Sequence, residues 1–174
     1  MSPNDRDPST DPDRRAILEF LAAQRASVLA IVDGLPESLL RTSVVPSKWT
    51  PLGLVEHITG AEYFWVQVVM LGKHDPMPLP DDSTPSAVMG PFVSDRPVSE
   101  VIEEYRALTA QNDTEIGDLS LGTAPRFRPG WVGPDEAPDL RWILLHLIEE
   151  TSRHAGHLDI ARELLDGRTG LGPR

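Results

Sequence analysis

Two residues with the chemistry to hold a divalent metal stand four positions apart near the end of this sequence. Glu150 and His154 lie in a segment whose apolar residues recur at helical spacing, so their side chains are expected on adjacent turns, ~5–6 Å apart. A carboxylate on an apolar helix face needs a partner, because burying an unpaired charge costs several kcal/mol. A metal ion bound by both side chains would be such a partner.

His57 offers a third ligand from a second predicted helix. It falls in the middle of an apolar stripe on that helix, which consists of Leu54, Ile58, Ala61, Phe64, Trp65 and Val68. Three protein ligands from facing helices, with an open coordination position, are typical of a catalytic rather than a structural zinc site. The alternative is that the three side chains form a hydrogen-bonded network in the core without metal.

Other polar residues beside these positions are candidates for supporting roles. His146 and His157 share the predicted helix of Glu150, and they would either contact the ligands and the substrate or lie at the bundle surface. Three further carboxylates are expected to point away from the site: Glu56, Glu62 and Glu149.

The loop before the last predicted helix has a basic and aromatic character. Arg126, Phe127, Arg128 and Trp131 lie in it, and they could close over a ligand that carries a carboxylate. Packing and surface charge explain the same residues equally well.

Four predicted helices must position these side chains. The expected spans are residues 12–33, residues 51–72 after the N-cap Thr50, a third helix capped by Ser99, and residues 140–165 between the cap Asp139 and Gly167. Six prolines exclude a regular helix from residues 73–97, and glycine and proline interrupt residues 119–138. No alternation typical of strands occurs, so the sequence predicts an all-α four-helix bundle with long crossover loops.

The length and composition of the chain predict a single domain and argue against some classes of binding partner. We expect one domain over residues 12–167, with a disordered tail at 1–11 and a short C-terminal tail at 168–174. A net charge of −11 with scattered basic residues argues against nucleic-acid binding. No apolar run is long enough to span a membrane and the N-terminus is not signal-like, so we expect a cytoplasmic protein.

The chain contains no cysteine. Any metal must therefore be held by histidine and carboxylate ligands, and any thiol that reacts must come from outside the chain.

The segments WTPLGLVEHITGAEYFW (49–65) and DLRWILLHLIEETSRHAGHLDIARELLDG (139–167) resemble the DinB-like superfamily, in the branch with mycothiol-dependent maleylpyruvate isomerase and mycothiol S-transferases. The resemblance covers about residues 12–167. It implies a four-helix bundle with a metal between helices, held by one histidine of the second helix and a His-x3-His pair of the fourth. Here the corresponding residues are His57 and the pair Glu150 and His154, and the glutamate matches the isomerase-like branch.

The resemblance further implies zinc, or another divalent metal such as nickel, that deprotonates a low-molecular-weight thiol for attack on an electrophile. Mycothiol is the thiol expected from this branch. We therefore expect a metal-dependent S-transferase, acting in detoxification. The alternatives are a thiol-dependent isomerase, a metal hydrolase, or a non-catalytic protein that binds small molecules or dimerises.

The identity of the electrophile does not follow from the sequence. A homodimer is a candidate assembly because three apolar residues of the last predicted helix are expected to point outward, where loops or a second copy would cover them: Leu144, Leu145 and Ile148.

Overall fold

A computed structural model gives the fold of residues 11–73, 92–129 and 138–169 of the chain. All regular elements in these ranges are helical, which confirms the predicted fold class. The helices are α1 (Pro12–Val32), the short α2 (Glu37–Leu40), α3 (Pro51–Glu62) with its π-helical continuation η3 (Tyr63–Met70), α4 (Val98–Glu115) and α5 (Leu140–Asp166). In these ranges no helix is both long and apolar enough to cross a membrane.

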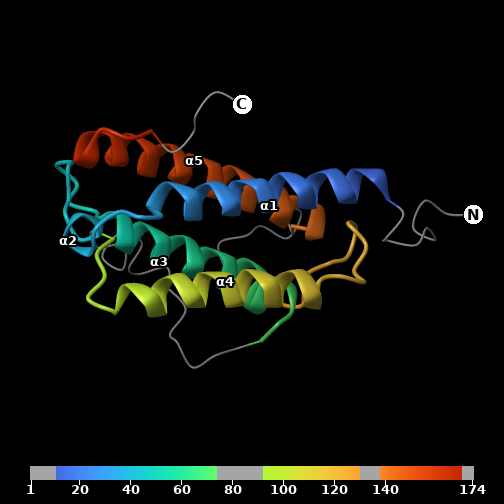
Figure 1. The fold of residues 1–174 in the computed structure, drawn as a ribbon. Coiled ribbons are helices and arrows are strands. Elements are labelled where there is room, and N and C mark those ends of the chain that lie inside the picture. The colour runs from blue at the N-terminus through green and yellow to red at the C-terminus, as the bar shows by residue number, and fades with distance from the viewer. Residues whose placement is uncertain (1–10, 74–91, 130–137, 170–174) are drawn as a thin grey trace, which may run out of the picture.

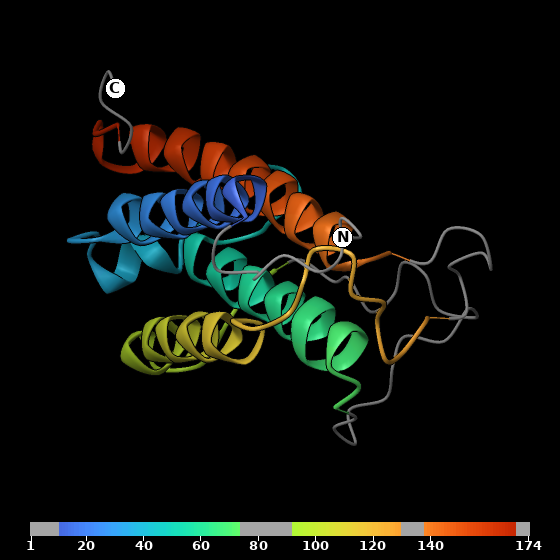
Figure 2. The ribbon, with the colours of Figure 1, turned by 90° about the vertical axis from the view of Figure 1, so that its right-hand side faces the viewer.

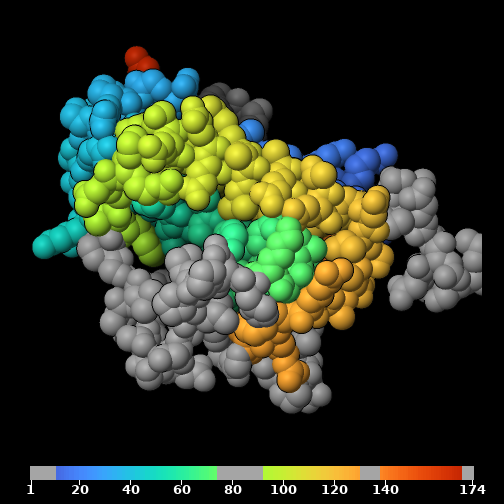
Figure 3. Space-filling view, turned by 90° about the horizontal axis from the view of Figure 1, so that it is seen from below, coloured from blue at the N-terminus to red at the C-terminus, as the bar shows by residue number. Residues whose placement is uncertain are grey.

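The long helices pack in two pairs. Helices α1 and α5 lie side by side and run in the same direction, while α3 with η3 and α4 run the opposite way (Figures 1 and 2). Arg162 of α5 donates to the carbonyls of Ile31 and Asp33 at the end of α1, which ties the two helix ends together. Figure 3 shows the face of the molecule on which α4 lies next to η3, which is coloured green.

Capping residues set most helix ends as the sequence predicts. The side chains of Thr50 and Asp139 accept hydrogen bonds from the first turns of α3 and α5, and Gly167 ends α5 with a φ of 78°. The prediction that Ser99 caps the third long helix is wrong. Helix α4 begins at Val98 after Pro97, because the fixed φ of proline favours a helix start and its carbonyl accepts from Val101.

The second long helix changes its winding halfway. Residues 63–70 are π-helical, and a hydrogen bond of 3.0 Å from the Leu71 amide to the Val66 carbonyl spans five residues rather than four. In a regular α-helix, the side chain of Trp65 would lie ~80° around the helix axis from that of His57, which is eight residues earlier in the chain. The slower rotation of a π turn returns Trp65 toward the His57 side of the helix.

Two apolar clusters fill the ends of the bundle, and polar side chains separate them. One cluster contains Val28, Ile31, Leu52, Ile58, Val101, Tyr105 and Leu158, and the other contains Leu21, Val66, Val69, Ile116, Ile143 and Leu147. Between them lies a layer of buried polar side chains from α1, from α3 with η3, and from α4, which we call the polar middle layer: Arg25, Glu62, Gln67 and Asn112.

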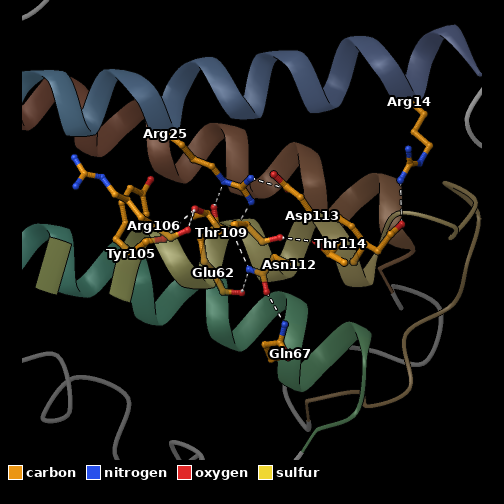
Figure 4. A network of polar contacts seen from close by, with 12 residues as sticks. Arg14, Arg25, Glu62, Gln67, Tyr105, Arg106, Thr109, Asn112, Asp113 and Thr114 are labelled. Carbon is orange, nitrogen blue, oxygen red and sulfur yellow. Dashed lines mark hydrogen bonds and ion pairs between the residues drawn. The ribbon is translucent and has the colours of Figure 1, made fainter. Parts of the chain in front are cut away.

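Glu62 is the centre of this layer. It points away from His57, Glu150 and His154, as predicted, but into the core and not toward solvent. Its side chain is 0% exposed and receives hydrogen bonds of 2.6 and 2.8 Å from Arg25 (Figure 4). Asn112 also donates to Glu62, and Gln67 donates to Asn112. Burial alone would lower the pKa of Arg25, but Glu62 and Asp113 outweigh it and raise that pKa above its ordinary value.

The outward apolar face expected on α5 is only partly present. Leu144 is fully buried in the second apolar cluster, because α5 packs against both α1 and η3 and therefore buries more than one stripe. Leu145 is 49% exposed. With Ile148 and with Ile17 and Phe20 of α1 it lines a shallow apolar groove.

We predict that Glu62→Gln destabilises the fold by about 3 kcal/mol, since it leaves the buried Arg25 without its bidentate partner. Urea denaturation followed by circular dichroism measures this loss. Glu19→Gln is the matched control, because Glu19 faces an arginine 3.9 Å away at a site where both side chains are over 70% exposed, and no measurable change is expected there. Equal midpoints for both variants would show that the buried pair contributes no more than a surface pair.

Candidate metal centre

His57, Glu150 and His154 come together between α3 and α5, as their helical positions predict. One oxygen of Glu150, Oε1, lies 3.1 Å from Nε2 of His57 and 3.0 Å from Nε2 of His154. One ligand atom from each residue lies within 4.8 Å of the other two. We call these three residues the triad. Its side chains are between 11% and 16% exposed, so a small molecule can still approach from solvent.

Glu150 brings one carboxylate to the triad. Hydrogen bonds with His154 and His57 hold the pKa of Glu150 well below its usual range, against the opposing effect of burial. Glu150 therefore remains a carboxylate at neutral pH. Its second oxygen is 3.4 Å from Arg153, a partly exposed side chain that also pairs with Glu149.

The donor set fits a divalent ion such as zinc or nickel. Two imidazole nitrogens and one carboxylate oxygen are ligands that both metals accept. Donors bound ~2.1 Å from one tetrahedral ion lie ~3.4 Å apart, which is close to the nitrogen–oxygen separations of 3.1 and 3.0 Å. With three protein ligands, at least one coordination position would be left for a substrate atom.

An aromatic ring that the sequence prediction missed covers His57. Phe92 stacks on this imidazole with ring centroids 3.9 Å apart and an angle of 20° between the planes. Its backbone is fixed because the Thr50 amide donates to the Phe92 carbonyl, 2.9 Å away. A Cβ on Gly53 would lie 2.1 Å from that carbonyl oxygen, so the absence of a side chain at position 53 makes this close approach feasible.

His157 lies beside the triad, on the outer side of His154. Its Nδ1 is 3.4 Å from Nδ1 of His154, and its ring is 6.2 Å from that of Trp49. Partial burial and the neighbouring His154 lower the pKa of His157. A neutral His157 can accept a hydrogen bond from Nδ1 of His154, which would leave Nε2 of His154 free to bind a metal.

His146 lies one helical turn before Glu150 and does not join the triad. It stacks on Trp142, with centroids 5.1 Å apart and a 16° angle between the planes, and it meets the edge of Trp65 at 4.9 Å. Burial lowers the pKa of His146, so this side chain is neutral at neutral pH.

The loop before α5 supplies the remaining candidates for ligand binding. Arg126 and Arg128 are exposed, and in the described part of the chain neither guanidinium has an ion pair. The backbone amide of Arg126 donates to the Met70 carbonyl, which fastens this loop to the end of η3. Trp131 lies outside the described residues.

The two other carboxylates expected to point away from the site do so. Glu149 is exposed. Glu56 is half-buried and pairs with Arg96 at 3.2 Å.

Comparison with known proteins places this chain in a family. No curated protein matches the sequence. The family model described as mycothiol-S-transferase matches residues 16–167, a range that includes α1 almost entirely, both helices of the triad and the loops between them. Because this match covers most of the chain, the protein belongs to the mycothiol-S-transferase family, a DinB-like family.

Proposed function

We propose that the protein is a metal-dependent S-transferase, in which His57, Glu150 and His154 hold one zinc ion, or another divalent ion such as nickel. The observation that carries the proposal is the convergence of two histidine Nε2 atoms on one carboxylate oxygen, at 3.1 and 3.0 Å. The name of the family supports mycothiol as the thiol substrate. The family name also fits an enzyme rather than a binding protein.

A divalent ion bound there would act as a Lewis acid that holds a thiol as its thiolate at neutral pH. The chain's own residues would prepare the site for this chemistry. The carboxylate of Glu150 offsets part of the ion's charge, and the stacked ring of Phe92 restricts water on the His57 side. His157 can hold the proton of His154 on Nδ1.

The reaction that follows is a nucleophilic substitution or addition. The chain has no cysteine, so the attacking sulfur must come from the small thiol. With an aryl chloride as the electrophile, a carbon–sulfur bond forms, chloride leaves with the bonding electron pair, and the thiol proton is released to solvent. The natural electrophile would be a toxic compound of comparable reactivity.

The metal site can be tested with two neighbouring carboxylates on α5. We predict that wild type and Glu149→Gln each bind about one zinc per chain, whereas Glu150→Gln loses more than ~100-fold in affinity, because it removes both a ligand and the negative charge. Elemental analysis of untagged protein, followed by zinc and nickel titration, measures this difference. Zinc uptake by Glu150→Gln equal to that of wild type would refute the assignment, and no uptake by wild type would favour a metal-free network.

The activity can be tested with the same three proteins, mycothiol and a chloroarene, 1-chloro-2,4-dinitrobenzene. We predict that wild type and Glu149→Gln consume the thiol and release chloride in equal amounts, and that Glu150→Gln is slower by about 100-fold or more, since it lacks the metal that activates the thiol. Glutathione in place of mycothiol shows whether the thiol is selected. A metal-loaded protein without thiol consumption, but with hydrolysis or isomerisation of test substrates, would contradict the transferase assignment.

A further inference from the structure

We propose that Trp65, Trp142 and His146 form a binding surface for a planar, electron-poor ring of the electrophilic substrate. We call these three residues the aromatic shelf. The role of the shelf in conjugation rests on the proposed S-transferase function. Its binding of a ring does not, because none of the three residues belongs to the triad.

The shelf is a continuous aromatic surface built from two helices. Trp65 of η3 lies 5.2 Å from Trp142 and 4.9 Å from His146, measured between ring centroids. Trp142 and His146 of α5 are stacked with a 16° angle between their planes. Phe64 extends this surface, with its ring 5.3 Å from that of Trp65.

Part of the shelf is open to solvent, which distinguishes it from core packing. Trp142 is 47% exposed, although an indole of this size normally buries most of its surface. Trp65 and His146 are each half-buried. A ring that stacks on Trp142 would remove this apolar surface from water.

The shelf lies next to the triad along the same two helices. His146 precedes Glu150 by one turn and Trp142 precedes it by two, so the shelf extends from ~6 to ~12 Å along α5 from the triad. On the facing helix, the π-helical winding of η3 returns Trp65 toward the side that carries His57. A substrate with its ring at the His146 end of the shelf can therefore place a reacting ring carbon, or a carbon attached to the ring, toward the triad.

The charges around the shelf favour a neutral, electron-poor ring over an anion. Indole faces are electron-rich and attract electron-poor rings. The carboxylate of Glu149 lies 3.7 Å from His146, and burial keeps His146 uncharged. The nearest arginine on this helix toward the triad, Arg153, is already paired with Glu149 and Glu150.

The test uses 1,3-dinitrobenzene, which is planar and electron-poor and lacks a leaving group such as chloride, with the full chain and no thiol. Isothermal titration calorimetry should show binding that does not depend on zinc. We expect Trp142→Ala to weaken this binding about tenfold and Trp142→Phe to restore most of it. Phe20→Ala is the matched control, because Phe20 is 62% exposed on α1 and outside the shelf, and it should bind as wild type does.

A second ligand separates ring electronics from general hydrophobicity. We expect 1,3-dimethoxybenzene, an electron-rich ring of similar size, to bind at least about fivefold more weakly than 1,3-dinitrobenzene. Unchanged binding in Trp142→Ala, or equal affinity for the two rings, would overturn the proposal.

Different experimental results would refute the binding role of the shelf and the proposed S-transferase function. If 1,3-dinitrobenzene binds as expected but no thiol is ever conjugated, the shelf stands and the S-transferase assignment falls. If conjugation proceeds and Trp142→Ala leaves the KM for the chloroarene unchanged, the shelf falls and the assignment stands. Support for both requires a raised KM for the chloroarene, with little change in kcat or in the KM for the thiol.

Discussion

Two carboxylates inside a helical bundle create the electrostatic constraint on which this structure depends. Glu62 is fully buried in the polar middle layer, and Glu150 is largely buried between α3 and α5. Glu62 is neutralised by Arg25, a cation that the chain itself supplies. Glu150 has two imidazoles on one oxygen and only a partly exposed arginine on the other, so its negative charge is available to a cation from solution.

The two charge centres also explain how the long helices are fixed relative to one another. The network around Glu62 joins α1, α3 and α4, and the triad joins α3 to α5. Helix α3 with η3 takes part in both, and it is the most apolar of the long helices. Its position sets the distance between the triad side chains, because neither His57 nor Glu62 can move without disturbing a partner.

Helical periodicity was sufficient to find the triad but not its surroundings. Glu150 and His154 are one turn apart on one helix, and His57 lies on an apolar stripe, so simple angular positions predicted their convergence. The same reasoning did not predict that Glu62 is buried against Arg25 of α1 and Asn112 of α4, because a helix in the middle of a bundle buries more than one face. Phe92 reaches His57 from a proline-rich connection, where no local pattern indicates a contact, and Trp65 is displaced by a π turn that a constant rotation per residue does not describe.

The contact between Gly53 and the Phe92 carbonyl has a consequence for comparing relatives of this protein. A chain with any larger residue at the position of Gly53 cannot bring the segment before its α4 this close to α3. Its histidine at the position of His57 would then have a different cover, even if the same three residues formed its triad. Position 53 can therefore sort members of the family by how the residues at the positions of the triad are screened from water, a property that the identity of those three residues does not reveal.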